Sequence, residues 1–159
     1  MDDFWTDWVP RERANLCFVV KNGRILLIRK KRGLGAGKIN GPGGKIEPGE
    51  TALEAAVRET QEEIGVTPLR LEERGVLRFQ FTDGYSLHCV VFFAEDCLGE
   101  PIETEEATPM WVPIEGIPYA EMWADDRHWL PLALEGKSFD GWFEFDGDSM
   151  RSQRIDLRH

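Results

Sequence analysis

Cysteine is scarce in this sequence, and its placement argues against two classes of small protein. The 159 residues include three cysteines, Cys17, Cys89 and Cys97, and no two of them have Cys-x-x-Cys spacing. An odd set without that spacing is typical neither of a disulfide framework nor of a zinc knuckle. Cys17 and Cys89 fall inside apolar runs, so we expect both to be small buried thiols.

Long apolar runs and a basic leader are lacking as well. No run is long enough to span a bilayer, and the first five residues, Met1–Trp5, are acidic. That start has neither the basic residues of a secretion signal nor the Arg-rich composition of a transit peptide. We therefore expect a cytoplasmic protein with no membrane partner. Because no exposed interaction motif stands out, we also expect a monomer.

Basic residues are also few relative to acidic residues. The chain carries 19 Lys and Arg against 29 Asp and Glu, for a net charge of −10. A protein that binds nucleic-acid backbone usually has a basic stripe, and none dominates here, so we expect no nucleic-acid partner. An acidic site can hold a triphosphate only if cations lie between the two. A nucleotide enzyme of this composition should therefore depend on a metal.

Hydrophobic patterning predicts mostly strands. Apolar runs at residues 16–20 and 25–28 flank Asn22-Gly23, a pair that favours a type I′ hairpin turn. Residues 32–49 hold seven Gly and two Pro and predict a loop. Later strands are predicted at residues 76–82, 87–94, 111–112 and 142–145.

Two helices are expected between these strands. Thr51 and Glu54 form a capping-box pattern, and Gly65 is suited to end the helix in a left-handed conformation. The predicted inward face comprises Leu53, Ala56, Val57, Thr60 and Ile64. The second helix should run from an Asp125 N-cap to Glu135, with Pro131 making it short or irregular.

The order of these elements predicts the fold class. Strands surround each helix, so we expect an α/β (α+β) fold with a mixed β-sheet sandwiched between helices. The length suits one domain over residues 1–159. Its Trp-rich residues 1–12 look like an N-terminal extension.

Three carboxylates on the first helix suggest chemistry. Glu59, Glu62 and Glu63 stand at i, i+3 and i+4, so they share one side of the helix. Each like-charge pair costs about 0.2–0.5 kcal/mol even in solvent. A hard cation such as Mg²⁺, which prefers oxygen ligands, would turn that repulsion into binding. The alternative is a solvated acidic face, which is common on helices.

The flanking residues favour the cation. Gly44, five residues, Glu50, seven residues and then Arg58-Glu59-Thr60-Gln61-Glu62-Glu63-Ile64-Gly65-Val66 resemble the Nudix box. Eight of its nine specified positions match, and Thr60 stands where an aliphatic residue is usual. Thr60 is β-branched like Val, so it should still pack, with its hydroxyl bonded to a carbonyl one turn earlier. The resemblance implies the Nudix fold.

The same resemblance implies roles for the matched residues. Glu59, Glu62 and Glu63 would be metal ligands, and Gly43 and Gly44 would let backbone carbonyls approach the metal. The metal would be Mg²⁺, for which Mn²⁺ can substitute. Arg58 would pair with Glu50. For Arg58 alone, the other reading is a surface pair with Glu62, which stabilises little.

Outside the box, residues 30–41, 122–132 and 139–145 are similar to the animal-type Nudix enzymes that hydrolyse oxidised purine nucleoside triphosphates. That resemblance covers residues 14–147 and implies that Asn40, Trp123, Asp125 and Asp126 contact the base. Lys30 would contact the triphosphate, and Phe79 would belong to the substrate pocket. Leu34 and Pro42 depart from the pattern, because aromatic residues are expected at both positions.

The Asp125-Asp126 pair has a physical rationale of its own. Burial and mutual repulsion would raise the pKa of such a pair, so one carboxyl could donate a hydrogen bond while the other accepts. Asn40 offers both a donor and an acceptor, and Trp123 offers a flat face for stacking. The alternatives are a plain helix N-cap for the two Asp residues and core packing for Trp123.

The expected reaction is metal-dependent hydrolysis between the α- and β-phosphates of an oxidised purine triphosphate such as 8-oxo-dGTP, which would cleanse the nucleotide pool. Glu63 and Glu106 are the general-base candidates. One rival is a Nudix hydrolase for dinucleoside polyphosphates, ADP-ribose or capped RNA, although RNA would favour a basic groove. The other rival is a Nudix module that binds nucleotides without catalysis.

Overall fold

The computed structural model describes residues 3–159. Short 3₁₀ turns are η1 (Asp3–Trp5), η2 (Ile114–Gly116) and η3 (Tyr119–Glu121), and the helices are α1 (Ala52–Ile64) and α2 (Asp126–Leu134). The strands are β1 (Glu12–Lys21), β2 (Arg24–Lys30), β3 (Ile39–Asn40), β4 (Gly43–Lys45), β5 (Thr67–Leu69), β6 (Glu72–Phe81), β7 (Ser86–Ala94), β8 (Asp96–Leu98), β9 (Ala107–Pro113), β10 (Phe139–Asp146) and β11 (Ser149–Leu157).

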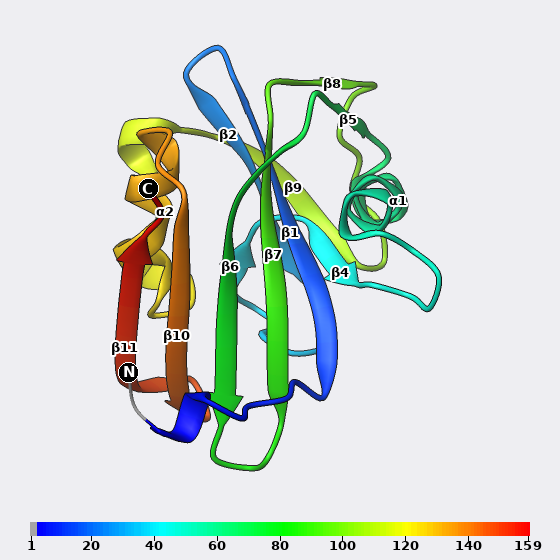
Figure 1. The fold of residues 1–159 in the computed structure, drawn as a ribbon. Coiled ribbons are helices and arrows are strands. Elements are labelled where there is room, and N and C mark those ends of the chain that lie inside the picture. The colour runs from blue at the N-terminus through cyan, green and yellow to red at the C-terminus, as the bar shows by residue number, and fades with distance from the viewer. Residues whose placement is uncertain (1–2) are drawn as a thin grey trace.

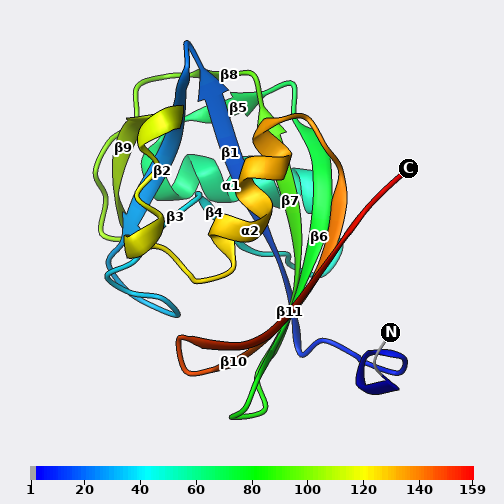
Figure 2. The same cartoon turned by 90° about the vertical axis from the view of Figure 1, so that its left-hand side faces the viewer.

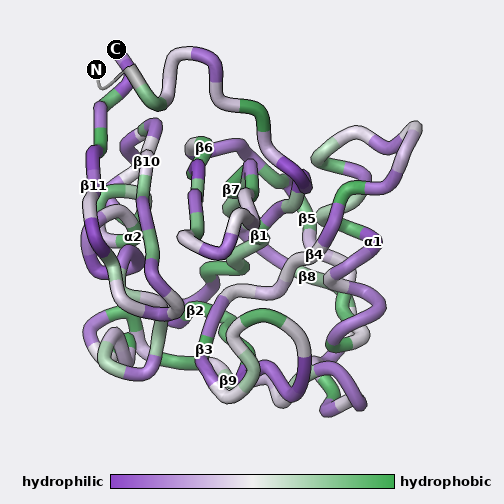
Figure 3. Tube along the Cα trace, turned by 90° about the horizontal axis from the view of Figure 1, so that it is seen from below, coloured by the Kyte–Doolittle hydropathy of each residue, from purple (hydrophilic) through white to green (hydrophobic). Residues whose placement is uncertain are grey.

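A mixed sheet forms the centre of the molecule. Its strand order is β11-β10-β6-β7-β1-β2-β3, with β4 paired to β1 and β9 paired to β2. The β1–β7 and β10–β6 pairs are parallel and the remaining pairs are antiparallel. Helices α1 and α2 lie on opposite sides of this sheet (Figures 1 and 3). The predicted mixed sheet between helices is confirmed.

Strand β1 divides the core between the two faces of the sheet. Phe18 packs into a cluster that includes Trp129 of α2. Its neighbour Cys17 points the other way, into a cluster with Ala56 of α1. This alternation follows from the two-residue period of a strand. The expectation of buried Cys17 and Cys89 is confirmed, since they are 0% and 3% exposed.

Local turn and cap signals were predicted correctly. Asn22 and Gly23 both have positive φ, at 54° and 74°, as a type I′ turn requires. Thr51 and Glu54 form the complete capping box, and Gly65 ends α1 at φ 75°. The Thr60 hydroxyl donates to the Ala56 carbonyl at 2.7 Å, which satisfies a polar group that is fully buried.

Several predictions about elements were wrong. Leu53, assigned to the inward face of α1, is 45% exposed, and Ala55 is buried instead. The observed buried face of α1 is therefore rotated around the helix axis, by part of a turn, from the predicted face. The predicted loop at residues 32–49 contains the short strands β3 and β4. The sequence also missed β5, β8 and β11, of which β11 is a mostly exposed edge strand without an apolar alternation.

The predicted N-terminal extension lies against one end of the sheet. Trp8 Nε1 donates to Gln80 Oε1 at 2.9 Å, and the Arg11 N–H donates to Ser86 Oγ at 2.8 Å. Figure 2 shows this segment beside the ends of β6 and β7, away from α1. Met1 and Asp2 lie outside the described residues. Within residues 3–159, no helix is long and apolar enough to cross a membrane.

The capping box gives a direct test of the helix that carries the carboxylates. Thr51→Ala removes the acceptor for the Glu54 N–H, a bond of 3.1 Å, and should cost about 1 kcal/mol. We expect Tm to fall by roughly 2–4 °C in thermal unfolding. Thr51→Ser keeps the hydroxyl and should unfold close to the wild-type temperature. Equal losses in both variants would contradict a role for the hydroxyl.

Candidate active site

One cavity of about 570 Å³ collects most of the predicted site residues. It lies between β1, β6 and β7, the segment that contains β3 and β4, and the start of α2. The predicted residues that line it are Lys30, Asn40, Gly43, Gly44, Glu63, Phe79, Trp123, Asp125 and Asp126. The structure therefore brings the predicted metal-binding end and the predicted base-binding end into one space.

The carboxylate end of the cavity depends on Glu63. Its side chain is buried, and its carboxylate accepts a hydrogen bond from the Gly43 N–H at 2.6 Å. Burial is the main reason that the pKa of Glu63 rises to about 7, and the negative charge of Glu59 adds to the rise. Burial also raises the pKa of Glu59. Both carboxylates would be more stable as anions beside a cation.

Two glycines allow the backbone to meet these carboxylates. A Cβ atom at Gly44 would overlap the carboxylate of Glu59, and a Cβ atom at Gly43 would overlap the carbonyl of Asn15. The side chain of Asn15 donates to the Gly44 carbonyl at 3.3 Å. Asn15 is a residue that the sequence analysis missed, because it sits inside an apolar run and matches no motif.

Arg58 fastens the helix to the preceding loop. Its guanidinium donates to both carboxylate oxygens of Glu50, at 2.6 and 2.9 Å, and to Glu59 at 2.9 Å. The same group contacts Glu62 at 3.2 Å and the Lys45 carbonyl at 3.1 Å. Hydrogen bonding to Arg58 lowers the pKa of Glu50 to about 2. The pairing of Arg58 with Glu50 that the resemblance implied is present, and the Glu62 contact is only one of several.

The C-terminal end of α1 is held by residues 102–104, a contact that the sequence did not predict. Thr104 Oγ1 donates to the Glu63 carbonyl at 2.6 Å, and the Ile102 N–H donates to the Ile64 carbonyl at 2.9 Å. These contacts satisfy carbonyls that a helix end leaves without partners. They also fix the backbone of Glu63 directly.

Four predicted residues do not line the cavity: Arg58 and Glu59, which lie behind the glycine backbone, and Glu62 and Glu106, which are more exposed. The Glu62 side chain is 59% exposed. Glu106 is half exposed and pairs with Arg32, whose Nε donates to it at 3.1 Å. The pairing with Arg32 lowers the pKa of Glu106. Neither Glu62 nor Glu106 lines the cavity.

The donors at this end are oxygen atoms of the kind that hold a hard divalent cation. Among residues 3–159, no three His, Cys, Asp or Glu side chains are gathered as a ready-made metal site. Mg²⁺ usually binds through one or two carboxylates and keeps water or phosphate oxygens as its other ligands. Glu59 and Glu63, with the nearby glycine backbone, supply a set of that kind.

The opposite end of the cavity contains two buried carboxyls. Asp125 and Asp126 are 2% and 3% exposed. Asp125 Oδ2 accepts from Trp129 Nε1 at 2.8 Å, while Asp125 Oδ1 and Asp126 Oδ2 are buried with no partner in the described part of the chain. Burial raises the pKa of both, and the charge of Asp125 raises that of Asp126 further. Two unsatisfied carboxyl oxygens in a cavity call for a ligand.

The simpler reading of this pair as a helix cap does not hold. Asp125 precedes α2, but its backbone is already helical and its side chain caps no N–H of the helix. The carboxyl is instead turned toward Trp129. The prediction that Asp125 is the N-cap is therefore right in position and wrong in chemistry.

Aromatic residues form the walls around the carboxyl pair. Trp123 meets Phe145 edge-on at 5.4 Å and Phe81 at 6.0 Å, and Lys38 Nζ lies 5.2 Å from its ring centroid. The indole is only partly buried, so core packing is not its whole role. Phe79 stacks on Phe143 at 5.5 Å.

The shape of the pocket also depends on Asn40, Leu34 and Phe81, which line it. The side-chain oxygen of Asn40, Oδ1, accepts from the Gly41 N–H at 2.8 Å, so the side-chain nitrogen Nδ2 is the group left to face a ligand. Leu34, which departs from the aromatic pattern, lines the cavity, whereas Pro42 does not. Phe81 also lines it, and the sequence analysis assigned it to a strand only.

Comparisons with known proteins identify the family and the fold. A family model described as the NUDIX domain matches residues 10–133. An oxidized purine nucleoside triphosphate hydrolase of Danio rerio is 48% identical over 133 residues, covering 83% of this chain and 85% of its own. The enzyme of that name in Mus musculus is 42% identical and covers 88% and 91%. The crystal structure of a MutT protein from Bacillus halodurans aligns with a TM-score of 0.82 at 29% identity, covering 91% and 97%.

The buried carboxyl pair should reduce stability at neutral pH. A carboxyl whose folded pKa is raised contributes most below its unfolded pKa, and stability falls as pH rises to the folded value. Asp126→Asn removes this penalty, so we expect Tm at pH 7 to increase by at least about 2 °C.

The size of that gain should depend on pH. Near pH 4 the wild-type carboxyl is already neutral, so the two proteins should unfold at similar temperatures. Asp7→Asn, at an exposed position, is the matched control and should change little at either pH. A loss of stability in Asp126→Asn at pH 7 would contradict the raised pKa.

Proposed function

The chain belongs to the Nudix family, and we propose that it hydrolyses oxidised purine nucleoside triphosphates such as 8-oxo-dGTP to the monophosphate and pyrophosphate. The observation that carries this proposal is the cavity itself. It joins two buried, unsatisfied carboxyls at one end to the Glu63 carboxylate and a glycine backbone at the other, and Glu59 lies against that backbone. A nucleotide has the matching polarity, with a hydrogen-bonding base and a polyanionic tail.

At the carboxylate end, we assign Glu59 and Glu63 to hold a divalent cation together with the backbone of Gly43 and Gly44. Nudix hydrolases generally use divalent metals, and the oxygen donors here favour Mg²⁺, with Mn²⁺ as a substitute. When bound, the cation neutralises phosphate charge and acidifies a water. The ammonium group of Lys30 lines the same space and offers a further contact for the triphosphate.

Arg58 acts through these residues. Because it bonds to Glu50 and Glu59 together, it keeps the helix and the loop in one relative position. Glu63 is the stronger candidate for the general base, since it lines the cavity and Glu106 does not. Glu62 faces solvent and would reach a cation only from outside the cavity.

At the carboxyl end, we assign Asp125 and Asp126 to the base edge of the purine. One protonated carboxyl donates while the ionised one accepts, so the pair can match a donor and an acceptor side by side. Asn40 contributes its amide nitrogen, and Trp123 and Phe79 contribute apolar surface. An oxidised purine differs from the normal base in its donors and acceptors, and buried polar groups discriminate strongly on that difference.

The relatives support the substrate class. Both the zebrafish and the mouse relative are named for oxidised purine nucleoside triphosphates, and each alignment extends over most of both chains. The monomeric state, the cytoplasmic location and the absence of nucleic-acid or membrane partners stay predictions from the sequence.

Substitution of the carboxylates should separate their roles. Glu63→Gln keeps the shape of the side chain but not its charge, so we expect kcat to fall by about 10²–10⁴-fold while the protein unfolds at a temperature no lower than that of the wild type. Glu62→Gln, on the exposed side of the same helix, should lose much less. Near-normal kcat in Glu63→Gln would remove Glu63 from the mechanism.

The substrate proposal is tested by pyrophosphate release from 8-oxo-dGTP and dGTP, side by side, with Mg²⁺ and with a chelator. We expect metal-dependent release with a higher kcat/KM for the oxidised nucleotide, and loss of that preference in Asp126→Asn. Equal cleavage of both nucleotides would keep the family chemistry and remove the selectivity. Cleavage of neither would reject the proposed substrate class.

A further inference from the structure

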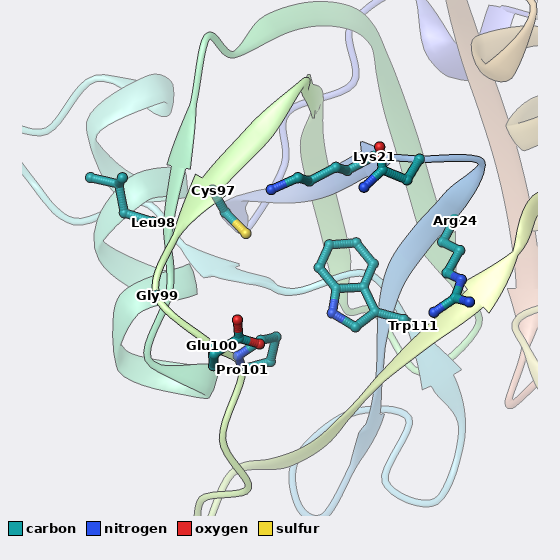
Figure 4. Close-up of a pocket in the computed structure, with 9 residues that line it drawn as sticks. Lys21, Arg24, Cys97, Leu98, Gly99, Glu100, Pro101 and Trp111 are labelled. Carbon is teal, nitrogen blue, oxygen red and sulfur yellow. The ribbon is translucent and has the colours of Figure 1, made fainter.

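A second cavity of about 600 Å³ lies apart from the candidate active site and shares no lining residue with it. Its walls come from the β1–β2 hairpin, the segment that runs from Cys97 to Pro101, and Trp111 of β9. Figure 4 shows the Trp111 indole between the hairpin and that segment. A space of this size accommodates a small organic ligand.

Opposite charges stand on the two sides of the indole. In Figure 4, Arg24 lies on one side of Trp111, and Glu100 with Pro101 lies on the other. In residues 3–159, neither Arg24 nor Glu100 has an ion pair or a side-chain hydrogen bond. Lys21 differs from them, because its ammonium group pairs with Asp96 at 2.8 Å; this pairing raises the pKa of Lys21, and the charge of Glu100 adds a smaller rise.

This arrangement specifies the chemistry of a ligand. A half-exposed indole favours a planar ring that can stack on it. An unpaired guanidinium favours phosphate, which it can bind through two hydrogen bonds. An ionised carboxylate can only accept hydrogen bonds, so Glu100 favours a ring edge that carries N–H donors. The ligand should therefore have an anion at one end and ring N–H groups at the other.

We propose that this cavity binds a guanine nucleoside monophosphate. The guanine edge presents adjacent ring and amino N–H donors to Glu100, the base lies on Trp111, and the phosphate reaches Arg24. Adenine has no ring N–H on that edge and would leave Glu100 poorly satisfied. The site does not depend on the proposed reaction, since none of its residues lines the active-site cavity.

Cys97 provides a reporter for this site. Its thiol points toward the recess beside Trp111 (Figure 4) and is only partly buried, whereas Cys17 and Cys89 are buried. A thiol reagent should therefore label Cys97 in the folded protein, and a ligand on Trp111 should slow that labelling.

The experiment measures the rate of Cys97 labelling in the full chain with increasing GMP or AMP. We expect GMP to slow labelling and to bind about 10-fold more tightly than AMP. The reason is that guanine offers the charged Glu100 carboxylate a ring N–H hydrogen bond that adenine lacks. Glu100→Gln should remove the difference between the two nucleotides. Arg24→Gln should weaken both by a similar factor.

Matched controls come from an ion pair outside the cavity. Lys137 and Glu135 pair on the surface at 3.3 Å, so Lys137→Gln and Glu135→Gln should behave like wild type. Pyrophosphate release should be unchanged in Arg24→Gln and Glu100→Gln, which separates this proposal from the catalytic one. No protection by GMP, or equal protection in Glu100→Gln and wild type, would overturn it.

Discussion

The site depends on the contact between the backbone of Gly43 and Gly44 and the carboxylates of α1. Only glycine leaves room for Glu59 and Asn15 at these two positions. The contact places Glu63 where a backbone N–H can satisfy it, and it forms one wall of the candidate active-site cavity. Arg58, the capping box and the Thr104 contact all serve to hold α1 in that position.

The carboxyl pair at the other end of the cavity lowers the stability of the folded protein. Asp125 and Asp126 are buried among aromatic side chains with oxygens that lack partners. A core built for stability alone would place apolar residues there. Such departures from the packing rules concentrate at functional sites. Burial thus raises the pKa of one carboxyl pair, Asp125 and Asp126, while the proposed cation would relieve the repulsion within the other, Glu59 and Glu63.

The sequence predicted the elements whose signals are local. The Asn22-Gly23 turn and the caps of α1 are determined by neighbouring residues, and both predictions were confirmed. The edge strand β11 has no apolar face, so its existence depends on pairing with β10 that no local pattern records. The Nudix box identified the carboxylate helix, but only the packed structure shows that Glu62 faces solvent. The bond from Trp129 to Asp125 spans only four residues, but the sequence pattern also favoured a helix cap at Asp125, which the structure does not show.

The central claim is that a divalent cation binds where the glycine backbone meets α1. Paramagnetic Mn²⁺ broadens NMR signals close to its binding site, so an amide spectrum recorded during a Mn²⁺ titration locates that site. We predict that the amide signals of Gly43, Gly44 and Glu63 disappear first, at substoichiometric Mn²⁺. Broadening that begins instead in the acidic segment 103–106 would contradict the account.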